Sequence, residues 1–289
     1  MANMITKKQL RSTSLPSRSH PSTSEIEEAL NKIKTRNTTT GSSESILMGL
    51  AGLEELYNCT EEFLKMGSTQ RVMSSGGSEF MEEMLDGSLR LIHICSVSRD
   101  LMAETHGHVR GVHSCVRRKK VAGGGDQLVV AVSGYVGFRK NMRKEAKKLL
   151  GSLKKIDGVS GSCDNEYEDE HLVAVIDAMR RVVSASVVVL KSFLELLSGR
   201  QSNIKSKLAS VLKKKKDHHE ATKNELETLD SVIRGDSCGH DDLQKKLDEV
   251  EMSVCGFEKN LEGLFRRLIR TRASLLNIIS HYKKLMYAM

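Results

Sequence analysis

The chain has 289 residues, a formal net charge of +8, no Trp, 4% aromatic residues and two prolines. Pro16 and Pro21 both lie near the N-terminus, so residues 22–289 contain no helix-breaking proline. This composition predicts an all-α protein and argues against a β-sandwich or an enzyme core rich in aromatic rings. The basic charge favours acidic partners without identifying one. The six cysteines include no Cys-x-x-Cys pair, and we expect them to be reduced.

The first 23 residues are predicted to be a disordered, basic, Ser-rich tail, and residues 24–289 a helical bundle domain. Within the tail, Arg11-Ser12-Thr13-Ser14-Leu15-Pro16 matches the Arg-Ser-x-Ser-x-Pro pattern that 14-3-3 proteins bind when the second serine is phosphorylated. The phosphate would lie in an arginine cluster of the partner, and Pro16 would turn the chain out of the groove. The tail resembles a transit peptide in composition but lacks the apolar segment of a secretory signal. A cytoplasmic tail is favoured, with plastid import as the alternative.

Apolar periodicity and capping residues predict a series of helices separated by Gly- and Ser-rich breaks. Their expected ranges are Ser24–Arg36, Glu44–Lys65, Ser78–Lys120, Gln127–Ile156, His171–Ser198, Ser202–Leu212, His219–Arg234 and a final helix from Asp241. The buried stripe of the helix over Ser78–Lys120 is expected to include Leu89. The run Val187-Val188-Val189 is poor in helix propensity, so a strand is the alternative there.

A heptad seam organises the C-terminal region. Apolar residues recur in steps of four and three, with one interruption at Thr271: Leu243, Leu247, Val250, Val254, Phe257, Leu261, Leu264, Leu268, Leu275, Ile278, Tyr282 and Leu285. A helix of about 45 residues would be about 70 Å long and needs other helices along its length. Those helices could belong to a second chain, but intramolecular packing is favoured. The sequence therefore predicts a monomeric, elongated multi-helix bundle with long antiparallel helices.

A strongly basic region lies between Arg117 and Lys155, where twelve Lys or Arg accompany two acidic residues. On the helix from Gln127, apolar residues share one face, and a candidate patch for an anionic surface flanks them: Arg139, Lys140, Arg143, Lys144, Lys147 and Lys148. Such a helix can lie on an anionic membrane, but packing in the bundle with solvated lysines is favoured. The sequence argues against nucleic-acid binding, because recognition motifs are absent and stacking rings are scarce. Lys213–Lys216 is interpreted as a solvated helix end, with a nuclear import signal as the alternative.

No metal site, cofactor or catalytic centre is predicted. His106 and His108 lie two residues apart and should face different sides of a helix, while His113 is too far along to join them. Cys238-Gly239-His240 lacks a second ligand pair. The glycines at 123–125 are not followed by Gly-Lys-Ser/Thr, so they are no phosphate loop. The uncharged run Val182–Leu190 is about half the length of a membrane span. The sequence therefore favours a non-enzyme.

Five blocks of the sequence resemble the plant-specific BYPASS-related family. They are residues 14–21, Gly52-Leu53-Glu54-Glu55-Leu56-Tyr57, residues 85–91, residues 147–154, and Gly263-Leu264-Phe265-Arg266-Arg267-Leu268-Ile269-Arg270-Thr271-Arg272 with its continuation to Ile278. The last block is the most specific and contains a signature cluster of arginines: Arg266, Arg267, Arg270 and Arg272.

The resemblance implies a helical protein with a role in root and shoot development, and it carries over no catalytic or ligand residues. We expect an intracellular regulatory or adaptor protein that acts through protein contacts. The alternative is a peripheral membrane protein that binds anionic lipid through the face over Phe138–Lys155. The turn at Gly67-Ser68 departs from relatives, which carry a more apolar, often proline-containing turn there.

Overall fold

The computed structural model of the chain describes residues 23–36, 42–76, 78–122, 125–157, 169–199, 224–233 and 240–288. Regular secondary structure within these ranges consists of eight helices and no strand: α1 (Ser24–Arg36), α2 (Ser43–Lys65), α3 (Gly67–Gly76), α4 (Ser78–Ala122), α5 (Gly125–Asp157), α6 (Glu170–Ser198), α8 (Glu225–Ile233) and α9 (His240–Ala288). The prediction of an all-α protein is confirmed. The Ser-rich tail and the helix predicted over Ser202–Leu212 lie outside the described residues.

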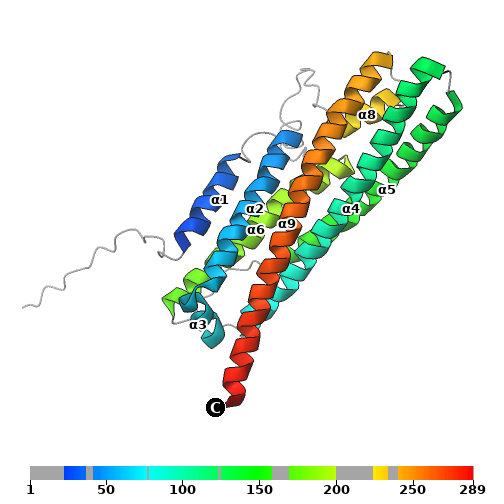
Figure 1. Ribbon diagram of the computed structural model, residues 1–289. Helices are drawn as coiled ribbons and strands as arrows, with labels where there is room; N and C mark the ends of the chain where they lie inside the picture. Colours follow the sequence, from blue (N-terminus) through cyan, green and yellow to red (C-terminus); the bar gives the residue numbers. More distant parts are fainter. Residues whose placement is uncertain are drawn as a thin grey trace, which may run out of the picture.

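Five long helices form a closed ring around the core of an elongated bundle (Figure 1). Helix α9 packs between α2 and α4, α5 packs against α4 and α6, and α6 returns to α2. Helix α4 runs antiparallel to α9 and α5, whereas α2 runs in the same direction as α9 (Figure 1). Helix α1 covers α2 and α6 on one side, α3 lies at the end of the bundle nearest the C-terminus, and α8 packs on α9.

The heptad seam of α9 faces into this ring. Every seam residue from Leu247 to Ile278, including Thr271, is buried. The side chains of Tyr282 and Leu285 lie outside the described part of the structure. Since α2 and α4 of the same chain cover the seam, this face of the long helix is buried without a second copy.

Two glycines of α9 allow α2 to approach closely. A Cβ added at Gly256 would lie 3.0 Å from Leu47 Cδ2, and one added at Gly263 would meet the carboxylate of Glu54. Asn260 Nδ2 lies between them and donates to the carbonyl of Leu47 at 3.0 Å. Leu47 and Glu54 are seven residues apart, as are the two glycines, so the parallel helices keep one register over a full heptad.

The structure corrects the sequence interpretation at several points. Helix α2 ends at Lys65 as expected, but after one extended residue, Met66, the unpredicted helix α3 begins. On α4, Leu89 is 52% exposed, and the neighbouring Leu91 and Ile94 are buried in its place. The valine run at 187–189 is helical, so the alternative of a strand there is wrong. A Cβ added at Gly87, Gly107 or Gly111 of α4 would have no neighbour within 4 Å, so these glycines do not mark a close approach of another helix.

Candidate functional site between α4 and α9

A ladder of polar side chains joins the two longest helices beside the apolar seam. Helix α4 contributes Arg99, His106 and His113, which are seven residues apart and therefore share one face. Helix α9 contributes the residues that directly follow five seam positions: Asp248, Glu251, Cys255, Glu258 and Glu262. Because the helices are antiparallel, the ladder begins with Arg99 Nη1 at 2.9 Å from Glu262 Oε2 and ends at His113.

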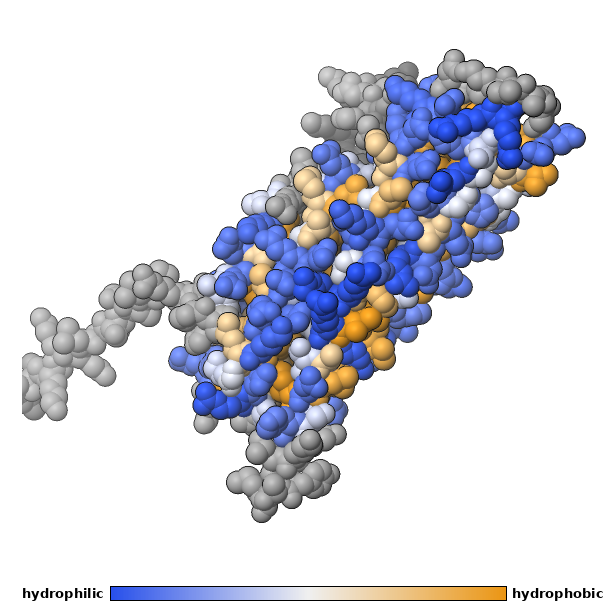
Figure 2. Space-filling model, viewed as in Figure 1, coloured by the Kyte–Doolittle hydropathy of each residue, from blue (hydrophilic) through white to orange (hydrophobic). Residues whose placement is uncertain are grey.

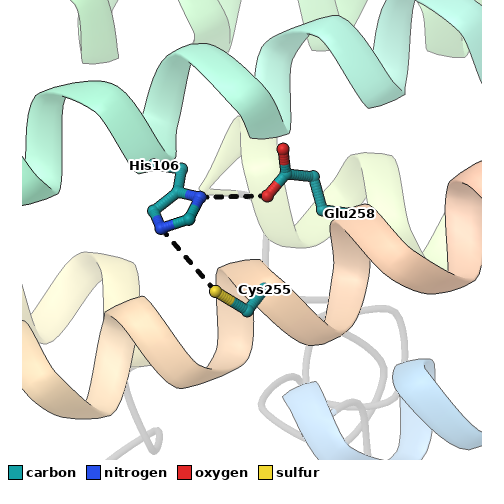
Figure 3. A group of neighbouring side chains, drawn as sticks. All are labelled: His106, Cys255 and Glu258. Carbon is teal, nitrogen blue, oxygen red and sulfur yellow. Dashed lines mark hydrogen bonds and ion pairs between the residues drawn. The ribbon is translucent and has the colours of Figure 1, made fainter.

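The centre of the ladder is His106 (Figure 3). Its Nδ1 lies 3.0 Å from Glu258 Oε2, and its Nε2 lies 3.7 Å from Cys255 Sγ. The same Nε2 is 3.6 Å from Oε1 of Glu251. In this geometry a ring proton on Nδ1 donates to Glu258, and Nε2 faces the sulfur and the second carboxylate.

Glu251 links this cluster to a second one around His113. The other carboxylate oxygen of Glu251, Oε2, lies 3.4 Å from His113 Nδ1. His113 Nε2 is buried and lies 3.3 Å from Asp248 Oδ1. The angles of this contact do not suit a hydrogen bond, and Nε2 makes none with any other described residue. The guanidinium of Arg110 approaches Glu251 Oε1 at 3.7 Å from the solvent side.

The two cysteines of this interface have different environments. Cys95 is buried and its thiol donates to the carbonyl of Leu261, and burial raises the pKa of this thiol to about 12. Cys255 is exposed and free. Burial of its sulfur, together with the carboxylates of Glu258 and Glu251, raises the pKa of the Cys255 thiol. Cys95 is therefore an inert core residue, whereas Cys255 is accessible to a ligand.

The signature arginines follow Glu262 toward the C-terminal end of α9, and the structure identifies their partners. Arg266 pairs with Glu262 of its own helix, and Arg267 Nη1 lies 3.5 Å from Glu61 Oε2 of α2. Arg272 crosses to α4, where it donates to the carbonyl of Leu85 and to Ser88 Oγ. Arg270 is exposed near Glu61. The cluster therefore ties α9 to both of its neighbours in the ring.

These contacts perturb the two carboxyl groups involved. The pKa of Glu61 is lowered, chiefly by its hydrogen bond from Lys65, with Arg270 and Arg267 adding to the effect. The pKa of Glu262 is lowered by hydrogen bonds from Arg266 and Arg99. Both carboxylates therefore stabilise the folded state only while they are ionised.

On α5 the predicted basic patch is divided. Lys140, Lys144, Lys147 and Lys148 are exposed as expected. The inclusion of Arg139 is wrong, because its side chain is 2% exposed and its Nε and Nη2 donate to Asp230 of α8 at 3.0 and 2.9 Å. Arg143 also donates to Asp230, and Tyr135 Oη completes the set at 3.1 Å. A buried charge needs such a partner, so Arg139 is a structural link between α5 and α8.

The spacing of the histidines along α4 did not indicate the side chains that surround His106 in the structure. His108 does face another side of α4, where it stacks on Phe138 at 4.7 Å. The partners of His106 come from α9, about 150 residues away in sequence. A signal was present nonetheless, because the acids and Cys255 follow successive seam positions with steps of three and four. The phosphorylation motif of Arg11, Ser14 and Pro16 lies outside the described residues.

The fold and the ladder together define an all-α protein built on a ring of long helices whose polar contacts lie beside one central seam. The family model described as "Protein BPS1" matches residues 49–278, and the chain belongs to this family. The match begins in α2 and ends in α9, so it contains both sides of the ladder. It confirms the BYPASS-related resemblance, and membership fits a plant developmental regulator.

Two further searches, of curated proteins and of solved structures, found no match. Among the helices within the described ranges, none combines the length and the apolarity that crossing a membrane requires.

Proposed function

We propose that the protein is a non-enzymatic regulatory or adaptor protein that acts in the cytoplasm as a monomer, through contacts with other proteins. The observation that carries this proposal is an exposed apolar set on the outer face of α4 and α9. Leu89 is 52% exposed, Ile269 44% and Leu276 43%. Residues 269 and 276 are seven apart and so share one face of α9.

The three side chains lie on adjoining stretches of two packed helices. Arg272 of α9 contacts Leu85 and Ser88 of α4, so Leu89 lies beside the stretch of α9 that carries Ile269 and Leu276. Figure 2 shows apolar groups interrupting the hydrophilic surface in this region, beside α9 and the N-terminal half of α4. We call Leu89, Ile269 and Leu276 the apolar patch. Contiguous apolar surface rimmed by polar residues is typical of an interaction site.

Charge indicates the chemistry of the partner. The exposed guanidinium groups of Arg266 and Arg270 border the patch, and Arg90 follows Leu89 on α4. An amphipathic helix with acidic flanks would place its apolar stripe on the patch and pair its carboxylates with these arginines. The patch lies within the family's matched region and contains part of its most specific sequence block.

The test compares proteins captured from plant tissue by proximity labelling with three versions of the full chain. Ile269→Glu/Leu276→Glu introduces charges into the patch, and Met252→Glu introduces one at a 75% exposed position of the same helix outside it. The proposal expects a set of partners that the double variant loses at least tenfold and the control retains. Equal labelling by all three versions would reject the patch as the contact surface.

A peripheral membrane role is the second candidate, and the outer face of α5 favours it. Val129, Val130 and Val136 are exposed on the first turns of this helix, and the exposed lysines 140, 144, 147 and 148 follow on the same side. Apolar side chains beside lysines suit an anionic lipid surface. Its test is sedimentation with vesicles containing phosphatidylserine. Binding that falls with added salt and is lost in Val129→Asp/Val130→Asp supports this role, and no binding at low salt excludes it.

A further inference from the structure

We propose that the α4–α9 ladder contains a binding site for one divalent transition-metal ion of the Zn²⁺ class, with His106 Nε2, Cys255 Sγ and Glu251 Oε1 as protein ligands. The three residues offer a nitrogen, a sulfur and an oxygen, the donor atoms that Zn²⁺ takes in proteins. They come from both helices, so the ion would connect α4 with α9. This site is independent of the apolar patch and goes beyond the proposed function.

The distances from His106 Nε2 to the other two ligand atoms suit a shared ion better than direct hydrogen bonds. Zn²⁺ binds nitrogen, oxygen and sulfur at about 2.0–2.3 Å, which places tetrahedral ligand atoms about 3.3–3.6 Å apart. His106 Nε2 lies 3.7 Å from Cys255 Sγ and 3.6 Å from Glu251 Oε1. The second of these distances is too long for a hydrogen bond from a ring N–H, which is about 2.7–3.2 Å. Coordination by all three ligands also requires Cys255 Sγ and Glu251 Oε1 to come within this range of each other.

The orientation of His106 is the second support. A histidine that binds a metal through one nitrogen usually donates the other ring N–H to a carboxylate, which fixes the tautomer and the ring plane. Glu258 fills this position at 3.0 Å from Nδ1 (Figure 3). With the ring proton on Nδ1, Nε2 is able to bind a metal, and it faces Cys255 and Glu251. Glu258 is therefore a positioning residue rather than a ligand.

His113 supplies an independent observation at the neighbouring position. It is 7% exposed, its Nδ1 lies 3.4 Å from Glu251 Oε2, and its Nε2 has no hydrogen-bond partner among the described residues. A buried nitrogen in this state is uncommon in folded proteins. With Asp248 it places further nitrogen and oxygen atoms beside the carboxylate that would bind the ion, and it holds the second oxygen of Glu251 in place.

The competing interpretation is a row of ordinary ion pairs. Arg110 pairs with Glu251 Oε1, but at 3.7 Å and from a mostly exposed side chain, so the ion could displace it without burying the guanidinium. Ion pairing gives no role to Cys255, whose sulfur is directed at His106 rather than at an apolar surface (Figure 3). Metal binding gives Cys255 a role as a ligand beside His106 and Glu251, and it gives Glu258 the role of orienting the His106 ring.

The experiment titrates the metal-free full-length protein with Zn²⁺ by calorimetry and with Co²⁺ by absorption, which detects cobalt–thiolate charge transfer. We expect one tight equivalent in the native chain. Cys255→Ser should abolish the charge-transfer band, and His106→Ala should weaken Zn²⁺ binding more than 100-fold. Glu258→Gln should weaken it about 10–100-fold, the usual effect of losing an orienting carboxylate.

Matched controls use residues of the same types outside the ladder, His93→Ala on α4 and Cys59→Ser on α2, and both should bind like the native chain. Cys255 is exposed, so Cys255→Ser tests the site without disturbing the core. All other cysteines remain in that variant, so adventitious thiol binding would persist in it. A Cys255→Ser chain that keeps the native stoichiometry, affinity and cobalt band would overturn the proposal.

Discussion

The buried pair of Arg139 and Asp230 predicts a large effect of one substitution on the free energy of unfolding. Asp230 accepts hydrogen bonds from Tyr135 Oη, from two nitrogens of Arg139 and from Arg143. Asp230→Ala removes all of these acceptors and leaves the guanidinium of Arg139 in the core without a counter-charge. Breaking a buried pair in this way costs about 3–5 kcal/mol of unfolding free energy.

For a chain of this size, 1 kcal/mol shifts the melting temperature by roughly 2–4 °C, so Asp230→Ala should melt roughly 6–20 °C below the native protein. The assays are thermal unfolding followed by circular dichroism and urea unfolding at 25 °C. Burial and the adjacent carboxylate raise the pKa of Tyr135 well above its ordinary value, so the phenol is a neutral donor at neutral pH.

An apolar replacement of the whole network distinguishes a buried charge from a simple loss of packing. In Tyr135→Phe/Arg139→Met/Asp230→Leu no polar group is left unpaired except Arg143, whose side chain is 29% exposed and can reach water. Such replacements are often neutral or stabilising, so the triple variant should recover most of the loss. If Asp230→Ala lowers the unfolding free energy by less than about 1 kcal/mol, the range for an exposed pair, the reasoning is refuted.

Three further predictions follow from the helix contacts and the tail. Gly107→Ala, where no neighbour meets the new Cβ, should raise the unfolding free energy by about 0.5–1 kcal/mol in urea, whereas Gly256→Leu should lower it by about 1–3 kcal/mol. The lowered pKa values of Glu61 and Glu262 mean that their contribution is complete above the ordinary value of 4.5 and is lost as the pH falls below it. Urea unfolding from pH 7 to 3 should therefore show a smaller acid-side loss in Glu61→Gln/Glu262→Gln, and an unchanged profile would refute this assignment. Phosphorylation of Ser14 should be required for capture by 14-3-3 protein, and capture of Ser14→Ala would disprove the motif.

The helices themselves were predictable because their signals are local. The start of α4 at Ser78 and the end of α6 at Ser198 agree with the sequence interpretation, and the burial of α9 follows its seam. Periodicity within one helix is sufficient for these features, since the apolar face must be buried whichever helices cover it. The unpredicted α3 has a weaker signal, because it is short and rich in Ser and Gly.

The misassigned residues depend on partners that periodicity does not reveal. Arg139 lies directly beside Phe138 in the apolar stripe of α5, and only the carboxylate of Asp230, 91 residues later, makes its burial favourable. Leu89 fits the apolar period of α4 but is exposed. In that part of α4 the contact with α9 is made by Ser88, which accepts from Arg272, and the side chain of Leu89 is left outside it. Neither outcome could be derived without knowing which helices are neighbours.

One register on α9 connects these features and explains why the ladder and the signature arginines occur on the same helix. Three positions of α9 at intervals of seven residues lie beside three positions of α2 at the same interval. The pairs are Gly256 with Leu47, Gly263 with Glu54, and Arg270 with Glu61. Glycines are required at the first two positions because α2 is close, and at the third, where the side chain is exposed, an arginine faces the acid.

The polar ladder follows the opposite flank of the same seam, toward α4. A shift of α9 by one residue would separate His106 from Glu258 as well as Arg267 from Glu61. The contacts to α2 and α4 therefore fix one position for α9 between them. A metal ion at Cys255 would hold the position that the arginines already select, and the apolar patch beside those arginines would be presented on a rigid helix.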